Sequence, residues 1–88
     1  MAFVDTGAWF AKFVRDDPDH VRVQAWFDET EDVLLTTDYC IDETLTLLVV
    51  RERLSRALVA GRSLFNPNVA RIHFVTQAQV ERAWILFQ

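Results

Sequence analysis

The sequence predicts an α/β fold in which flanking helices cover a parallel three-stranded sheet. Apolar segments too short for helices alternate with longer segments of helical periodicity. The three strand segments are residues 1–4, 33–36 and 69–75, and a helix-capping signal follows each of them. Strands that alternate with helices pair in parallel through right-handed crossovers. The 88 residues contain no internal repeat and no interdomain linker, so we expect a single domain over residues 1–88.

The first strand and two short helices come before the second strand. Residues 1–4 are apolar and lead directly into Asp5, which is typical of a buried strand that ends in a charged turn. Thr6 is the expected N-cap of a helix over residues 8–13. The next helix is expected to begin at Pro18, with the residue before it, Asp17, as its cap.

Three further helices are expected in the rest of the chain. Thr37 and Asp38 cap a long helix that starts at Tyr39 and runs to about Arg53. Ser55 is the expected cap of the next helix, which ends at Gly61 or a little beyond. After the third strand, Thr76 and Gln79 have the spacing of a capping box, which predicts a last helix from about Gln77 that is still running at Gln88.

The composition indicates a folded domain with more apolar side chains than one small core uses. Residues of the apolar types make up 51% of the chain, which excludes a disordered segment. The longest unbroken apolar run, residues 83–87, is far too short to cross a membrane, and no basic residue precedes the N-terminal apolar stretch as in a signal peptide. The single cysteine, Cys40, fits a reducing compartment, so we expect a cytoplasmic protein. The apolar excess suggests a partner, or a fragment of something larger.

The charges are distributed unevenly along the chain. Eleven of the 13 acidic residues lie in residues 1–44, whereas six of the nine basic residues lie in residues 45–88, all of them Arg. A net charge of −4 argues against a protein that coats nucleic acid non-specifically. The six arginines have two interpretations that the net charge leaves open. They lie on solvated helix faces, or they form a local face that binds anions.

Two carboxylates are expected at the same edge of the sheet. Asp5 directly follows the first strand, and Glu43 lies early in the helix that begins where the second strand ends. Parallel strands place their carboxyl ends at one edge, where ligands of α/β proteins bind. Glu43 shares a helix stripe with apolar residues, where a carboxylate is costly to bury unless it is paired or bound to a cation. Carboxylates without Cys or His favour a hard cation such as Mg²⁺ or Mn²⁺.

Both segments resemble motifs of a known family. Residues 3–10 (FVDTGAWF) resemble the opening motif of PIN-domain proteins, and residues 36–44 (TTDYCIDET) resemble their second motif. The nearest subgroup is that of the bacterial VapC-type toxins. The resemblance implies a PIN-like fold and a metal-dependent endoribonuclease that cleaves RNA phosphodiesters with Mg²⁺ or Mn²⁺. It also implies an antitoxin protein as partner.

The resemblance assigns roles to particular residues. It matches Asp5 and Glu43 to the catalytic, metal-binding carboxylates of the family. The supporting residues expected around them are Thr6, Asp38 and Asp42. Three arginines are expected to steer RNA toward this site, namely Arg51, Arg53 and Arg56.

The sequence departs from the family pattern after the third strand. Family members carry further essential aspartates there, and this chain has no counterpart of them. We therefore expect a C-terminally truncated domain that lacks the last strand or strands and a helix, with weak or no activity of its own. The loss of a strand would expose the first strand as an edge, which predicts a homodimer or larger oligomer.

Two other functions compete with the nuclease. One is a catalytically inactive PIN-like module for binding or self-association. The other is an α/β domain similar to response regulators, which also bind Mg²⁺ through an acidic cluster. That class requires a paired acid before the first aspartate and a lysine after a late strand, and the sequence has neither.

Overall fold

The sheet has the predicted number and direction of strands. A computed structural model of the chain describes residues 1–51 and 53–88. In it, β1 (Ala2–Phe3), β2 (Leu34–Thr37) and β3 (Arg71–His73) form a parallel sheet in the order β1-β2-β3. The fold class predicted from the sequence is thus confirmed.

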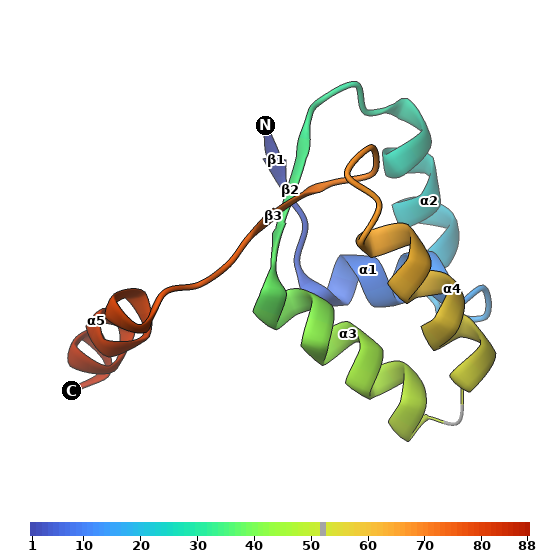
Figure 1. Ribbon diagram of the computed structural model, residues 1–88. Coiled ribbons are helices and arrows are strands. Elements are labelled where there is room, and N and C mark those ends of the chain that lie inside the picture. The colour runs from blue at the N-terminus through green and yellow to red at the C-terminus, as the bar shows by residue number, and fades with distance from the viewer. Residues whose placement is uncertain (52) are drawn as a thin grey trace.

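Four helices pack together and a fifth lies apart. They are α1 (Thr6–Phe13), α2 (His20–Glu29), α3 (Asp38–Val50), α4 (Leu54–Leu64) and α5 (Gln77–Phe87). Figure 1 shows α1 to α4 gathered on one side of the sheet, while α5 stands apart at the end of an extended segment that follows β3. Every residue of α5 is exposed. Within the described residues, no helix has both the length and the apolar character needed to cross a membrane.

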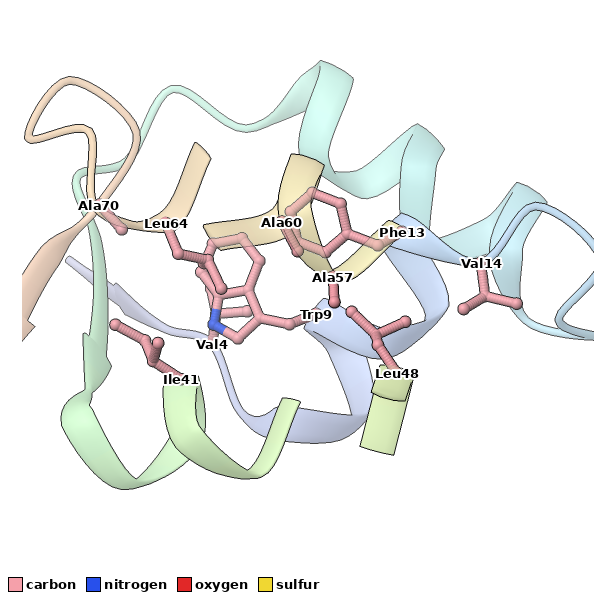
Figure 2. Close-up of a cluster of buried hydrophobic side chains, with 10 residues drawn as sticks. All are labelled: Val4, Trp9, Phe13, Val14, Ile41, Leu48, Ala57, Ala60, Leu64 and Ala70. Atoms are coloured by element: carbon pink, nitrogen blue, oxygen red, sulfur yellow. The ribbon is translucent and has the colours of Figure 1, made fainter. Parts of the chain in front are cut away.

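The core is centred on Trp9 of α1, which is completely buried. Its ring stacks on Phe27 of α2 and on Phe13, with centroid distances of 5.2 and 6.3 Å. Figure 2 shows aliphatic side chains of α3 and α4 around this indole, among them Ile41 and Leu64, together with Val4 and Ala70, which border β1 and β3. Because side chains of four helices, of β2 and β3 and of Val4 meet here, the core packs the helices against the sheet.

Two helix starts differ from the prediction. The N-cap of α1 is Asp5, whose Oδ1 accepts a hydrogen bond from the Ala8 backbone at 3.0 Å, and Thr6 is the first residue of the helix. Both residue types are good caps. Asp5 takes the role because its backbone is extended, as that of an N-cap residue is. The second helix begins at His20 rather than at Pro18, because Asp17 accepts from the Asp19 backbone at 2.8 Å and closes a turn there instead.

The long helix is shorter than predicted at its C-terminal end. Thr37 caps α3 as expected by accepting from the Cys40 backbone at 3.1 Å, but the helix ends at Val50. Glu52, which the predicted helix would include, lies outside the described residues. The next helix begins at Leu54, so Ser55 is inside its first turn and is not its cap.

The third strand is also shorter than predicted, because the chain leaves the sheet after His73. The start of α5 is confirmed. Thr76 accepts from the Gln79 backbone, and the Gln79 side chain accepts from the Thr76 backbone at 3.0 Å, which completes the capping box.

Candidate functional site

Asp5 projects from the point where β1 ends and α1 begins. It is exposed, and among the described residues only its Oδ1 is engaged, as the helix cap. Gly7 does not crowd this oxygen, because even a Cβ added at Gly7 would lie 3.6 Å from it, an ordinary van der Waals distance. Asp5 lines a groove along the outer edge of β1 together with Phe3, Val4, Ala8, Arg22, Val23 and Trp26.

Glu43 lies in the second turn of α3 and is also exposed. The next residue, Thr44, is fully buried, and its Oγ1 donates to the Cys40 carbonyl at 2.6 Å. This fixes which face of α3 is turned inward and leaves Glu43 on the solvent side. There it borders a shallow groove with Tyr39, Asp42, Thr46 and Leu47. The apolar stripe predicted around Glu43 therefore flanks it at the surface without burying it.

The sheet places Asp5 and α3 after neighbouring strands. The Val4 backbone donates to the Leu35 carbonyl at 2.8 Å, immediately before Asp5. Thus Asp5 and the first turn of α3 both follow the carboxyl ends of β1 and β2. The two carboxylates nevertheless line separate grooves, and no cluster of three or more His, Cys, Asp or Glu side chains in the described part of the chain is arranged to hold a metal ion.

The three supporting residues have different surroundings. Thr6 is half-buried at the start of α1. Asp38 is the first residue of α3, and its Oδ1 accepts from the Val75 backbone at 3.0 Å, so it anchors the segment after β3. Asp42 is exposed and lies between the Glu43 groove and a second groove on α3.

Two of the three arginines make contacts at the other end of α3. The Arg51 guanidinium lies 5.3 Å from the centre of the Phe10 ring, and Arg53 forms an ion pair of 2.8 Å with Asp16. Helix rise places Arg51 about 12 Å along the axis from Glu43. The third, Arg56, is half-buried in α4. The RNA-steering role of these arginines thus stays a prediction. The ion pairs found among the described residues join none of them to Asp5 or Glu43.

The Arg53–Asp16 pair affects both ionisation equilibria. The hydrogen bond from Arg53 is the main reason why the pKa of Asp16 lies below its ordinary value of 3.8. The same contact raises the pKa of Arg53. The pair joins the loop after α1 to the start of α4.

Sequence reasoning missed the groove beside Asp42, whose walls are Phe65 and Phe74. Phe65 is the C-cap residue of α4 and Phe74 follows the last residue of β3. Both side chains are exposed because the helix and the strand end just before them. Only a correct prediction of these two element ends would have revealed the groove.

The three-stranded parallel sheet, with Asp5 after β1 and Glu43 in the helix after β2, fits the PIN-like α/β fold that the two motifs predicted. Over 84 residues the chain is 33% identical to the 23S rRNA-specific endonuclease VapC20 of Mycobacterium tuberculosis, from strains CDC 1551 / Oshkosh and ATCC 25618 / H37Rv. The alignment covers 96% of this chain and 63% of that protein. No protein-family model matches the chain.

A solved structure agrees with the sequence comparison. The crystal structure of Mycobacterium tuberculosis VapC20, described as a toxin that cleaves the sarcin–ricin loop, matches with a TM-score of 0.90 at 28% identity. The match covers 99% of this chain and 66% of that one. The chain is therefore similar to VapC20 in both sequence and fold, and it has the PIN-like α/β fold that its two motifs predicted. It spans slightly less than two thirds of the length of these relatives.

Proposed function

We propose that residues 1–88 form a single PIN-like domain of a metal-dependent endoribonuclease, the toxin component of a toxin–antitoxin pair. The observation that carries this proposal is the pair of exposed carboxylates, Asp5 and Glu43, which follow adjacent parallel strands in a homologue of VapC20. The relative's name, a 23S rRNA-specific endonuclease, supports RNA as the substrate class.

The chemistry of these two side chains fits a hard divalent cation. Asp5 keeps Oδ2 available because only Oδ1 caps α1, and Glu43 makes no hydrogen bond or ion pair with any of the described residues. Carboxylate oxygens are the preferred protein ligands of Mg²⁺ and Mn²⁺. A bound Mg²⁺ or Mn²⁺ would activate water and polarise the phosphodiester. Asp5 and Glu43 would hold and orient that ion.

Two carboxylates hold a hydrated ion only weakly, because Mg²⁺ keeps most of its waters when few protein ligands are offered. The cap bond on Asp5 Oδ1 fixes the position of one carboxylate, whereas Glu43 is exposed and none of the other residues in 1–51 and 53–88 orients it through a hydrogen bond or ion pair. We expect low activity from this chain alone, since hydrolysis requires a fixed geometry around the metal.

The proposal includes partners and a location. An antitoxin protein and a second copy of the chain are the proposed protein partners, and the cytoplasm is the proposed compartment. Support for self-association comes from β1, which is an edge strand of the sheet with Phe3 56% exposed, and from the exposed apolar side chains of α5. Exposed strand edges and apolar surfaces of this kind recruit other chains.

The test is metal-dependent cleavage of an RNA fragment that carries the sarcin–ricin loop. We expect slow cleavage in Mg²⁺ or Mn²⁺, none in a chelator, and at least a tenfold loss in Asp5→Asn and Glu43→Gln. Glu31→Gln is the matched control, because Glu31 is an exposed acid on the loop before β2. Cleavage that survives Glu43→Gln would contradict the proposed site. Rapid cleavage that Glu43→Gln abolishes would contradict the low activity expected of the 88-residue chain.

The alternative function is an inactive binding or self-association module. Within residues 1–51 and 53–88 no three acidic, His or Cys side chains are clustered so that they could hold a metal ion, which favours it. A folded chain that shows no cleavage at any metal concentration, yet associates with itself in light scattering, would establish this alternative.

A further inference from the structure

We propose that Tyr39 holds one base of the RNA against α3, beside the phosphodiester that is cleaved. The groove concerned lies on the solvent side of this helix and is lined by Tyr39, Asp42, Glu43, Thr46 and Leu47. Its volume of about 390 Å³ is at the lower end of the range for small-ligand sites, which suits a single base. The inference rests on the proposed nuclease function, because Glu43 is a metal-binding carboxylate only in that function. It adds a residue that contacts the substrate and a basis for selecting the base.

Tyr39 lies close to Glu43 on the surface of α3. It is the second residue of the helix and Glu43 follows four residues later, so the two Cβ atoms are about 5–6 Å apart. The backbone of this turn is fixed, because the Thr37 side chain accepts from the Cys40 amide at 3.1 Å. A base on Tyr39 would therefore lie next to a phosphate that is bound through an ion on Glu43.

The Tyr39 ring is available to a ligand. Tyr39 is 56% exposed, and the ring pairs and cation–ring contacts found among the described residues do not include it. Single-stranded RNA is recognised largely through unpaired bases that stack on aromatic side chains. Because every base has a stacking face, an exposed ring beside the cleavage site can bind the substrate strand.

The charge of the groove determines which part of the RNA it takes. Asp42 and Glu43 are both exposed, and the ion pairs found among the described residues involve neither of them. A phosphate would be repelled here unless a cation lay between, whereas the face of a neutral base is not. The strand should therefore place its base on Tyr39 and its phosphate toward the ion proposed at Asp5 and Glu43.

Asp42 provides a means of selecting the base. It lies three residues after Tyr39, at a neighbouring position on the surface of the same helix. An ionised carboxylate accepts hydrogen bonds and cannot donate them. It can accept from the N4 amino group of cytosine, whereas uracil presents the carbonyl oxygen O4 at the same place. We therefore expect cytosine to bind more tightly than uracil, although the two rings are of the same size.

The test is an NMR titration of the full ¹⁵N-labelled chain with cytidine and with uridine, in the presence of a chelator. We expect saturable shifts of the Tyr39 ring protons and of the Asp42 and Glu43 amides, with cytidine tighter than uridine by about threefold or more. Tyr39→Ala should weaken cytidine binding about fivefold or more, whereas Tyr39→Phe keeps the ring and should bind as the original chain does. Trp84→Ala is the control, because Trp84 is 65% exposed on α5, outside the groove. Asp42→Asn should remove the preference for cytidine, since an amide both donates and accepts.

Three results would overturn the base site. They are an absence of saturable shifts at the groove up to the solubility limit, full cytidine binding in a folded Tyr39→Ala variant, and an equal loss in Tyr39→Phe and Tyr39→Ala. Equal affinity for cytidine and uridine, or a preference that survives Asp42→Asn, would contradict the selection by Asp42.

A cleavage assay in Mn²⁺ separates this inference from the proposed function. Nucleosides carry no phosphate, so their binding in a chelator does not depend on cleavage. Cytidine binding at Tyr39 without any cleavage of RNA would contradict the nuclease function and support the base site. RNA cleavage whose kcat/KM is the same in Tyr39→Ala would contradict the base site and leave the nuclease function standing.

Discussion

The Trp9 indole and the Thr36 hydroxyl are joined by a hydrogen bond of 3.0 Å in the interior of the domain. Both side chains are completely buried, and the Thr36 hydroxyl donates in turn to the Val4 carbonyl at 3.0 Å. One hydroxyl thus connects α1, β2 and the end of β1. Because Asp5 follows Val4 directly, this connection also sets the position of the first carboxylate.

Replacing Thr36 by Val should therefore destabilise the domain. Valine has nearly the same volume but leaves the Trp9 N–H without a buried acceptor, and an unsatisfied buried donor costs about 1–3 kcal/mol. Urea unfolding followed by tryptophan fluorescence measures the change. Thr36→Ser keeps the hydroxyl and should retain more stability than the valine variant. Equal loss in both variants would show that the methyl group matters and that the hydrogen bond does not.

Gly61 is a site where a substitution should stabilise the protein. It lies inside α4, and a Cβ there would meet Leu45 Cδ2 at 3.8 Å, an ordinary contact. Alanine is favoured over glycine within a helix by about 0.8–1 kcal/mol. We expect Gly61→Ala to raise the free energy of unfolding by about this amount. A lower value in the same urea experiment would show that α4 and α3 pack more tightly than this distance indicates.

The Asp16–Arg53 pair should make a small, pH-dependent contribution. The pKa of Asp16 is lowered in the folded state by the hydrogen bond from Arg53, so its stabilisation is present above the ordinary value of 3.8 and is lost as the pH falls below it. NMR titration of the Asp16 carboxyl should show this lowered pKa, and Arg53→Gln should return it toward 3.8. High salt should produce part of the same change, because the pair is exposed. An unchanged pKa in Arg53→Gln would contradict the contact.

The capping box should stabilise α5 locally and not the whole domain. Thr76→Ala removes the side-chain acceptor of the Gln79 amide, and loss of a cap costs about 1 kcal/mol. Because α5 is exposed throughout, amide exchange should accelerate about fivefold within α5 while urea unfolding of the core stays the same. Gln77→Ala, in the same turn but outside the cap, is the control. A large shift in global unfolding would mean that α5 packs on the body of the protein.

Local patterns made most of the fold predictable. The three strands and the caps at Thr37 and Thr76 depend on residues that are close in sequence, and the alternation of strands with helices indicated the parallel pairing. Asp5 and Thr6 are both good caps by residue type, and which of them caps the helix depended on backbone angles that the sequence does not contain. The bond between Trp9 and Thr36 spans 27 residues and becomes visible only once β1, β2 and α1 are packed together.

The candidate site was predictable to a smaller extent. Topology placed Asp5 and Glu43 after adjacent strands, as the alternation of strands and helices indicated. The exposure of Glu43 depended on Thr44 being the buried neighbour, which the helical pattern alone left open. The contacts of Arg51 and Arg53 with Phe10 and Asp16 depended on where α3 ends, and that boundary was predicted too far along the chain.

We propose that Asp5 and Glu43 bind one divalent cation between them. Mn²⁺ broadens the NMR signals of nearby nuclei, so a titration of the ¹⁵N-labelled chain maps the ion directly. We predict that the amides of Thr6 and Glu43 broaden together at the same Mn²⁺ concentration. Asp5→Asn or Glu43→Gln should each abolish broadening at both positions, while Glu31→Gln leaves it intact. Broadening at one position that survives loss of the other carboxylate would show two independent sites and contradict a shared metal centre.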